Sequence, residues 1–249
     1  MCGRYAYLPT VDPAELINQF SIHGDPPDVI PRYNVAPTDP VPVVHTNREL
    51  RRTAGVFRWG LIPSWSTPEA ARRSGHINAR AETLSQQPAF RWLLLKRRCL
   101  VLASGFYEWQ HGNSRRERIP HYFSPVPGSQ LVPISASTGV VAFAGLYDRW
   151  HAPDGSWVDS CTIITTTPNE LVAPLHDRMP VILAPEAIDL WLDLEVADPL
   201  LLSSTLAPAA DNALTSHRVS QAVNSVANDS WECLAPAEEW TQGELNLDA

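Results

Sequence analysis

Most apolar residues of the chain fall in short runs that predict β-strands rather than helices. The segments GVFRWGLIP, CLVLASGFYEWQ, VVAFAGLYDRW and SWVDSCTIITTT are rich in β-branched and aromatic residues, and the second is expected to break at Gly105. Two shorter runs, HYFSPV and LTSHRVS, predict further strands. The prolines of RYNVAPTDPVPVV exclude a helix there and predict a loop that leads into a strand.

Helical patterns are fewer and lie scattered between these runs. Asp12-Pro13-Ala14-Glu15 combines a capping residue, a first-turn proline and a glutamate, so it predicts a helix whose buried side carries Leu16, Ile17 and Phe20. Other short helices are predicted at residues 67–74, 85–97, 168–176 and 184–193. Strands dominate without sustained strand–helix alternation, which indicates a single α+β domain rather than a doubly wound sheet.

The composition is that of an ordinary globular protein, with 249 residues of which 44% are hydrophobic and 18% charged. No apolar run approaches the ~20 residues needed to span a bilayer. The first ten residues also lack the basic-then-apolar layout of a signal peptide, so we expect a cytoplasmic protein. Residues 236–249 are acidic and contain no basic residue, which predicts a flexible tail after a domain of residues 1–235.

The four cysteines do not follow the spacing of a metal site. No CxxC or CxxH motif occurs, so neither a metal nor another cofactor is expected. In a reducing compartment the cysteines should be free thiols. Cys99 and Cys161 lie in apolar runs and are expected to be inert core residues.

Charge is distributed unevenly along the chain, although the net charge is −8. Residues 1–118 hold 16 Lys and Arg against 10 Asp and Glu, a balance of +6, whereas residues 119–249 hold 3 against 17, a balance of −14. A protein that is acidic overall can still present one basic face to a nucleic acid, but a solvated lopsided surface would give the same counts. Lys96 is the only lysine, so amine chemistry is limited to this residue and the amino terminus.

The segment Met1-Cys2-Gly3-Arg4 is the first of four unusual stretches. The chain lacks a Walker phosphate loop, a GxGxxG motif and a GxSxG elbow. Removal of Met1 would give Cys2 a free α-amine beside its thiol, with pKa values expected near ~7.7–8.0 and ~8.5. Such a 1,2-aminothiol reacts with an aldehyde to form an imine and then a five-membered thiazolidine. The alternative is that Cys2 has no functional role.

Two further stretches carry candidate polar groups. In HINARAET, Asn78 and Arg80 lie two residues apart and would face the same side of an extended segment, where they could orient one group and bind a phosphate beside it. The segment HINARAET is at least as compatible with a polar loop that has only local hydrogen bonds and no function. In SGFYEW, Glu108 interrupts an aromatic strand, and apolar walls would raise its pKa towards neutrality. The alternative there is a buried salt bridge to an arginine.

The fourth stretch, PLHDRMP, places a histidine among charged neighbours. His176 could move protons, Asp177 could hold its orientation and Arg178 could bind an anion. Exposed aromatic rings near arginines would also form a stacking surface for single-stranded nucleic acid. Trp65 follows a predicted strand in a Pro/Ser loop and should be exposed, whereas Trp59 is expected in the core.

Seven motifs together resemble the SRAP family, the SOS-response-associated peptidases or abasic-site processing proteins. In order they are MCGR, RYNVAP, WGLIPSW, INARAET, SGFYEW, HDRMPVIL and VNSVANDS. The resemblance covers Cys2 to about residue 235 and implies an SRAP-like domain, mainly antiparallel with a barrel-like core. It also implies a DNA-damage sensor that binds abasic sites in single-stranded DNA and crosslinks them covalently as a thiazolidine, without an obligate protein partner.

The resemblance implies a role for each site residue. Cys2 would be the nucleophile, Asn78 would orient the Cys2 amine and the sugar, and Glu108 and His176 would serve the proton steps. The residues implied in DNA binding are Arg4, Arg80 and Arg178 as phosphate clamps and Asn34, Pro37 and Trp65 along a kinked strand. The family's peptidase label implies autocatalytic exposure of Cys2, with hydrolase or lyase-type activity.

Three other functions remain open. Glutamine amidotransferases also begin with Met-Cys-Gly and use an N-terminal cysteine nucleophile, but they expect Asn-Gly and Arg-Gly motifs that this chain lacks. A non-covalent single-strand binding module would not need Cys2. A lyase that uses a lysine amine would depend on Lys96.

Overall fold

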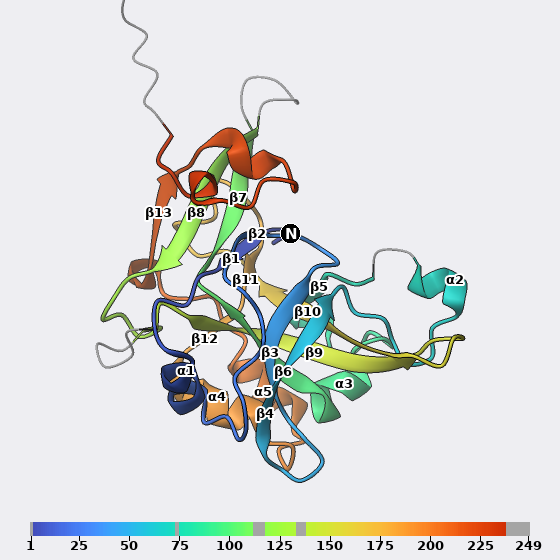
Figure 1. Cartoon of the computed structure of the whole chain (residues 1–249). Coiled ribbons are helices and arrows are strands. Elements are labelled where there is room, and N and C mark those ends of the chain that lie inside the picture. Colours follow the sequence, from blue (N-terminus) through green and yellow to red (C-terminus); the bar gives the residue numbers. More distant parts are fainter. Residues whose placement is uncertain (1, 73–74, 112–117, 133–137, 238–249) are drawn as a thin grey trace, which may run out of the picture.

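A closed five-stranded barrel forms the centre of the computed structural model, which describes residues 2–72, 75–111, 118–132 and 138–237 (Figure 1). Its strands are β3 (Pro40–Thr46), β4 (Arg52–Trp59), β6 (Arg98–Ala103), β9 (Val141–His151) and β10 (Trp157–Thr166). Strand β9 pairs with both β6 and β10, and β10 also pairs with β4, which closes the ring. Within the ring the β4–β10 pair is parallel and the other pairs are antiparallel.

Short strands extend this barrel, and a second sheet lies above it (Figure 1). β5 (Asn78–Arg80) runs parallel to β10, while β11 (Met179–Pro180) and β12 (Ile182–Leu183) pair with β10 and β9. The antiparallel second sheet has the order β13 (Leu214–Arg218), β8 (Arg118–Pro125), β7 (Gly105–His111), β1 (Tyr5–Tyr7) and β2 (Arg32–Val35). The α+β class and the barrel-like, mainly antiparallel architecture are therefore confirmed.

Gly105 marks the point where the chain leaves the barrel and enters the second sheet. The predicted break lies here, because β6 ends at Ala103 and β7 begins at Gly105. A side chain at this position would collide with the Phe123 carbonyl oxygen and the Tyr122 ring, so only glycine fits. At Gly105 the second half of CLVLASGFYEWQ, which includes Glu108, therefore leaves the barrel and enters the second sheet as β7.

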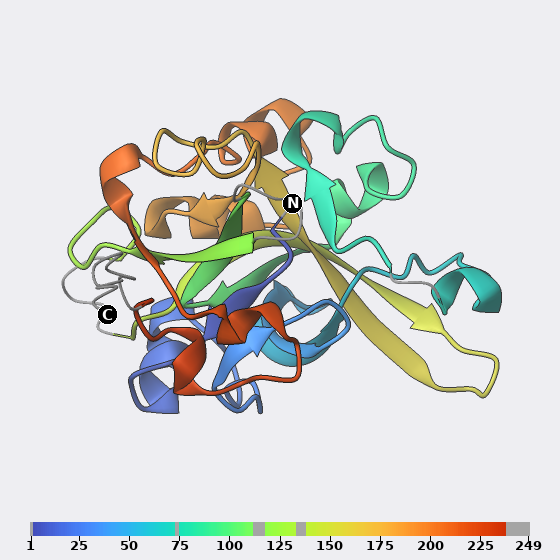
Figure 2. The ribbon, with the colours of Figure 1, turned by 90° about the horizontal axis from the view of Figure 1, so that it is seen from above.

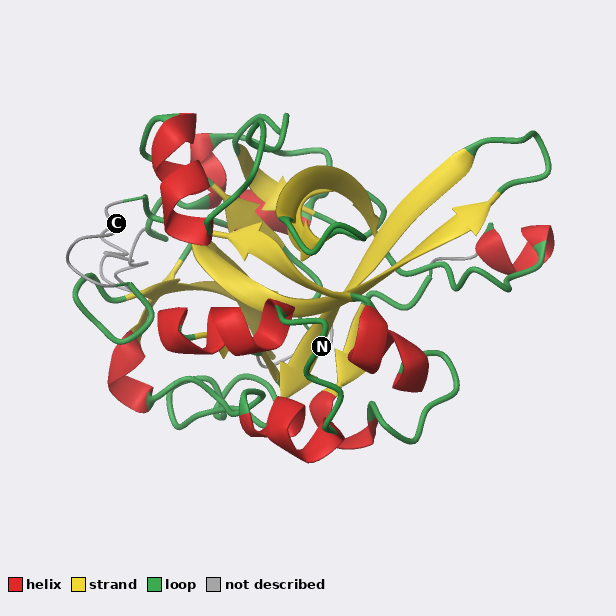
Figure 3. Cartoon of the chain, turned by 90° about the horizontal axis from the view of Figure 1, so that it is seen from below, coloured by secondary structure: helices red, strands yellow, loops and turns green. Residues whose placement is uncertain are grey.

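The helices are short and mostly lie at the other end of the barrel (Figure 3). They are α1 (Pro13–Phe20), α2 (Pro68–Ala71), α3 (Arg91–Lys96), α4 (Pro185–Leu192) and α5 (Pro199–Ser204), with 3₁₀ turns at Ala81–Thr83, Asp211–Ala213, Gln221–Asn224 and Trp231–Cys233. Asp12 caps α1 as expected, by accepting from the Ala14 amide. Helix α2 instead projects from the body beside the β9–β10 hairpin (Figure 2).

Three local predictions are wrong. Residues 32–35 form strand β2 rather than loop, because pairing with β1 outweighs the nearby prolines. The helix predicted over 85–97 is shortened to Arg91–Lys96, since Pro88 lacks an amide hydrogen and disfavours helical geometry before it. Residues 168–176 form only turns, and Pro174 prevents their extension into a helix.

The predicted boundary at residue 235 falls within a short contact. Pro236 bridges to Val219, and the Ala237 amide donates to the Arg218 carbonyl at 3.1 Å. The rest of the predicted tail, residues 238–249, lies outside the described residues, so its flexibility stays a prediction.

Arg98 joins the ends of two helices inside the core. Its side chain is fully buried, and burial lowers the pKa of its guanidinium to about 10. The guanidinium donates to carbonyls at the carboxyl ends of α3 and α4, those of Leu94, Leu95, Trp191, Asp193 and Val196. Arg98 therefore satisfies carbonyl groups that a helix end leaves open.

We expect Arg98→Met to lower the free energy of unfolding by at least about 3 kcal/mol, because several buried carbonyls lose their donor at once. Urea unfolding monitored by circular dichroism measures the change. Arg51→Met is the matched control, since that side chain is 58% exposed and its loss should change stability by no more than about 0.5 kcal/mol. Equal midpoints for the two variants would contradict the capping role.

Candidate active site

Cys2 lies three residues before β1 and belongs to the main hydrophobic core. It is fully buried, and its carbonyl oxygen accepts a hydrogen bond from Nδ2 of Asn78 at 2.7 Å. Two residues later, the Arg4 carbonyl accepts from the Tyr107 amide at 3.0 Å, which ties this segment to β7. Three parts of the chain far apart in sequence, the amino-terminal segment, β5 and β7, therefore meet at Cys2.

Burial changes the acidity of the Cys2 thiol. Loss of solvent is the largest cause and the negative charge of Glu108 the second, and together they raise the thiol pKa well above its usual range. The expectation of a partly ionised thiol concerns the chain without Met1, so it stays a prediction, while the thiol of the chain that retains Met1 is held protonated. Sulfur chemistry at this site needs a base or an electrophile that takes up the thiol proton.

Glu108 has the raised pKa that the aromatic strand predicts. Only 3% of the residue is exposed, and burial raises the carboxyl pKa to about 8. The positive charge of the amino terminus opposes this shift, whereas Asp177 adds to it. Oε1 is buried without a hydrogen-bond partner, and no arginine salt bridge to Glu108 occurs among the described residues. A protonated carboxyl at neutral pH can therefore donate or receive a proton here.

Asn78 and Arg80 occupy β5 as the spacing predicts. Ala79 between them is buried, Asn78 is half-buried and Arg80 is exposed, so both polar side chains lie on the side away from the core. Asn78 Oδ1 is buried and has no hydrogen-bond partner among the residues that the structure describes. The amide thus binds Cys2 through its nitrogen and keeps an acceptor that a protonated amine can satisfy.

His176 lies in the turn before β11 with Asp177 beside it. Its Nδ1 accepts from the Arg178 amide at 2.9 Å and lies 3.2 Å from Asp177 Oδ1. The negative charge of Asp177 also contributes to the raised pKa of Glu108, after burial. The hydrogen bond from the Arg178 amide fixes the His176 ring, while the orienting role of Asp177 and the proton-transfer role of His176 stay predictions.

Arg178 is bound to a carboxylate in this structure, and its role as a phosphate clamp stays a prediction. It is 8% exposed, and both terminal nitrogens bind the Glu82 carboxylate at 2.8 Å. The Glu82 carboxyl pKa is lowered, chiefly by this hydrogen bonding. Arg178 thus fastens the turn of His176 to the residues that follow β5. Sequence reasoning missed Glu82, because a partner 96 residues away leaves no local signal.

Arg4 and Asn34 are also bound to other parts of the chain. Asn34 is fully buried, and its Nδ2 donates to the carbonyls of Ser225 and Asn228 at 3.0 and 2.7 Å. Arg4 Nη1 donates to Asn34 Oδ1 at 2.7 Å and to the Val223 carbonyl at 2.8 Å. The pair therefore holds the segment 223–228, and contact of Arg4 and Asn34 with DNA stays a prediction.

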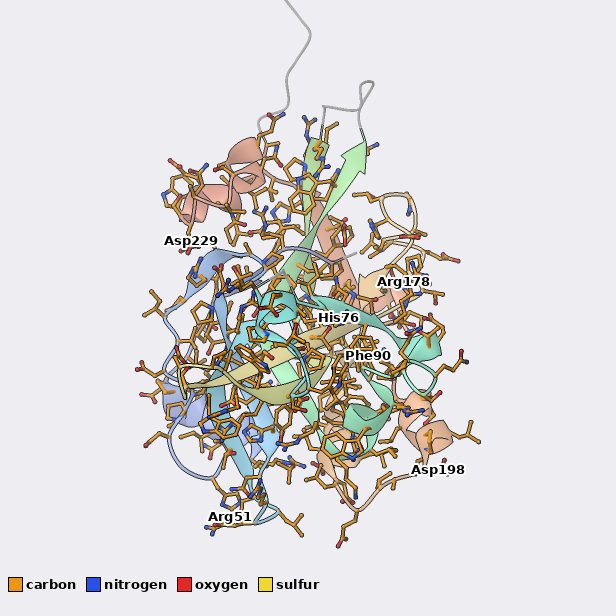
Figure 4. All side chains as sticks on the ribbon, turned by 90° about the vertical axis from the view of Figure 1, so that its right-hand side faces the viewer. Arg51, His76, Phe90, Arg178, Asp198 and Asp229 are labelled. Atoms are coloured by element: carbon orange, nitrogen blue, oxygen red, sulfur yellow. The ribbon has the colours of Figure 1, made fainter. Side chains whose placement is uncertain are left out.

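Asp229 completes this attachment. Its Oδ1 accepts from the amides of Tyr33 and Asn34 at 2.7 and 2.9 Å, and Oδ2 binds Arg32. Figure 4 places Asp229 and Arg178 in the same half of the molecule, with Arg51 at the opposite end. The late segment 223–230 thus forms one wall beside the start of the chain, a role that local sequence patterns did not reveal.

The remaining predicted DNA contacts reach the surface. Trp65 is 69% exposed in the loop after β4, as predicted, while Trp59 is fully buried in the core. Pro37 is half-buried in the loop between β2 and β3, and Arg80 is exposed. Their contact with DNA stays a prediction.

The cysteine predictions agree with the structure. All four cysteines are buried free thiols, and burial raises the pKa values of Cys99 and Cys161. Among the described residues, no group of three or more histidine, cysteine, aspartate or glutamate side chains could hold a metal ion. The described residues also contain no helix with the length and apolar character needed to cross a membrane.

The fold and site define an α+β barrel protein in which a buried second-residue cysteine is bound by an asparagine and lies near a buried, protonatable glutamate. The sequence model of one family, described as SOS response associated peptidase (SRAP), matches residues 1–226. The chain belongs to the SRAP family.

Relatives and solved structures agree with this assignment. The abasic site processing protein YoqW of Bacillus subtilis is 40% identical over 238 residues, which cover 94% of this chain and 99% of that protein. The abasic site processing protein HMCES of Mus musculus is 34% identical over 240 residues, 86% of this chain and 67% of that protein. A crystal structure of a Bacteroides thetaiotaomicron protein has the same fold, with a TM-score of 0.78, 24% identity, and coverage of 95% of this chain and all of that one.

Proposed function

We propose that this protein senses abasic sites in single-stranded DNA and captures them covalently through Cys2 after Met1 is removed. The observation that carries the proposal is the arrangement at Cys2: Asn78 holds its carbonyl at 2.7 Å, and Glu108 beside it has a pKa of about 8. The names of the relatives support abasic-site processing as the setting. A protein of this kind acts on DNA damage, and its place in the cell is expected to be cytoplasmic and on DNA.

The chemistry follows from an amine and a thiol on one residue. The ring-opened sugar of an abasic site exposes an aldehyde, and the Cys2 amine adds to its carbon. Loss of water from this adduct gives an imine. Sγ then bonds to the imine carbon while the thiol proton ends on nitrogen, so the thiazolidine forms with the release of one water molecule.

The neighbouring side chains serve the proton steps. Glu108 carries a proton at neutral pH and can give it to the departing hydroxyl group, and the resulting carboxylate can take the proton of the buried thiol. Asn78 fixes the Cys2 main chain, so the amine needs little reorientation. We assign His176 to proton transfer when the imine forms and when the crosslink reverses. Peptidase, hydrolase and lyase-type activities would be additional outcomes of the same nucleophile.

A single gel experiment tests the proposal. Untagged protein is mixed with a single-stranded oligonucleotide that contains one abasic site, and a denaturing gel is run beside Cys2→Ala. We expect a heat-resistant shifted band that the variant lacks. Absence of a band from protein shown by mass to lack Met1 would overturn the proposal, and glutamine hydrolysis would then be measured. An equal band from Cys2→Ala that is lost in Lys96→Ala would point to a lysine-type lyase instead.

Arg80 gives a separate prediction about DNA binding. Its exposed side chain lies two residues from Asn78 on the same strand, which supports a contact with a phosphate of bound DNA. We expect Arg80→Ala to weaken binding to every DNA sequence and to reduce the slope of log affinity against log salt by about 0.7, the loss of one contact to a single strand.

Fluorescence anisotropy at several salt concentrations measures this slope. Arg51→Ala is the matched control, because it removes an exposed arginine at the opposite end of the molecule (Figure 4). An unchanged slope for Arg80→Ala, or the same reduction for both variants, would remove Arg80 from the DNA surface.

A further inference from the structure

Three buried side chains of the β9–β10 hairpin hold the backbone of the loop that carries Trp65. Asp148 Oδ2 accepts from the Ser64 amide at 2.7 Å, and Trp150 Nε1 donates to the Ser66 carbonyl at 2.8 Å. Ser160 Oγ accepts from the Ile62 amide at 2.8 Å. The loop is thus fixed on both sides of Trp65 by groups more than eighty residues away in sequence.

Apolar contacts also hold the loop 62–66 to the hairpin, in addition to the hydrogen bonds. Trp150 is 9% exposed and forms a small apolar cluster with Ile62 and Ala152, separate from the main core. Ala71, at the end of α2, packs against the same cluster. This contact explains why α2 projects from the body together with the hairpin (Figure 2).

Trp65 contrasts with these anchors. Its indole is 69% exposed, although the residues on either side are held to the hairpin. Asp148, in turn, is 5% exposed, and its buried carboxylate accepts from the Ser64 amide of the loop and from the Arg149 amide of its own strand, so it fastens the loop to β9. A fixed backbone beneath a large exposed ring is the arrangement expected of a preformed contact surface.

We propose that Asp148 and Trp150 are positioning residues that hold the loop 62–66, so that the Trp65 indole forms a rigid stacking surface for a base of single-stranded DNA. This inference rests on the proposed function. Stacking on an indole that is already in place avoids the entropy cost of ordering the loop when DNA binds. Neither residue needs to touch DNA, because each acts through the loop backbone.

The test compares single and double variants for binding to a single-stranded pyrimidine oligonucleotide without a lesion. Trp65→Ala should weaken binding about tenfold, the loss expected for one stacked base. Trp150→Phe keeps an aromatic ring but removes the Nε1 donor and part of the indole that packs against Ile62, so it loosens the loop, and we expect it to weaken binding about threefold. In the Trp65→Ala background Trp150→Phe should have no further effect, because its target is already gone.

Asp148 provides a partial rescue by a conservative variant. Asp148 Oδ1 also accepts from the Arg149 amide at 2.9 Å, so Asp148→Asn keeps an acceptor for only one of the two amides and should weaken binding less than Asp148→Ala, for which we expect about a threefold loss. Trp157→Phe is the control, since it changes an exposed indole at the start of β10 that does not hold the loop. Circular dichroism confirms that each variant is folded, and Trp150→Phe carries the test if Asp148→Ala does not fold.

The outcomes separate this inference from the proposed function. Wild-type protein that crosslinks abasic DNA, combined with an undiminished effect of Trp150→Phe in the Trp65→Ala background, would overturn the positioning role alone. Unchanged affinity in Trp65→Ala and Trp150→Phe would overturn it as well. Wild-type protein that neither binds the oligonucleotide nor crosslinks abasic DNA would overturn both.

Discussion

Protein that retains Met1 should form no heat-resistant adduct with abasic single-stranded DNA. With Met1 in place the nitrogen of Cys2 belongs to a peptide bond, so it cannot attack an aldehyde. The thiol that remains is fully buried, and its raised pKa keeps it protonated at neutral pH. Neither half of the aminothiol can then act alone, and we expect crosslinking to fall from near completion to undetectable.

The measurement uses one preparation before and after processing. A cleavable amino-terminal tag blocks the terminus, and a site-specific protease that leaves Cys2 as the first residue restores it, with intact mass confirming each state. The same tag at the carboxyl terminus is the control and should have no effect. A blocked protein that still crosslinks would exclude the thiazolidine mechanism.

Cys2→Ser separates the two reactive groups. Once Met1 is removed, this variant keeps the amine but has no sulfur to close the ring. We therefore expect only a reversible imine, which becomes visible on a denaturing gel after reduction with borohydride. A stable adduct without reduction would show that ring closure by sulfur is not what makes the crosslink permanent.

The fold could be predicted where the sequence pattern was long enough to show a period. Strands β9 and β10 have eleven and ten residues, and their apolar runs indicated them directly. β1, β5, β11 and β12 have only two or three residues, too few for any periodicity, and exist because a neighbouring strand offers hydrogen-bond partners. Closure of the barrel likewise depends on which strands pair, as β10 does with β4 and β9, and the pattern of a single segment does not show this.

The candidate site also contains residues that the local sequence indicated and contacts that it could not indicate. Glu108 was identifiable because a carboxylate in an aromatic strand is unusual, and Asn78 because of its spacing from Arg80. The ion pair between Arg178 and Glu82 could not be predicted, because Glu82 lies on another element. The amide bonds of Asn34 to the late segment 223–228 likewise could not be inferred from its own surroundings in sequence.

Glu108→Gln should slow crosslinking about 10²- to 10⁴-fold, the usual contribution of a positioned acid or base. Glutamine keeps the size of the side chain but cannot exchange the proton. Wild-type protein should show a bell-shaped rate profile, rising as the Cys2 amine loses its proton and falling above about pH 8 as Glu108 ionises. The variant should keep the rising limb and lose the falling one, which single-turnover rates between pH 6 and pH 10 would measure.

DNA affinity and the exposed control Glu195→Gln distinguish this role from a structural one. Affinity measured by anisotropy should change far less than the rate, and Glu195→Gln should leave both unchanged. Equal losses of rate and affinity in Glu108→Gln would demote Glu108 to a structural residue.

The pH dependence of protein stability tests the raised pKa of Glu108 independently. Its pKa is raised on folding to about 8, so between about pH 4.5 and pH 8 the folded state holds a proton that the unfolded state has released. This contribution to stability is complete below the lower value and falls by about 1.4 kcal/mol per pH unit as pH rises through the interval. Glu108→Gln removes the dependence, so its stability relative to the wild type should increase from pH 5 to pH 8 and level off above. A constant difference in urea unfolding free energy would mean that Glu108 is already ionised in the folded protein, and its role as an acid would be lost with it.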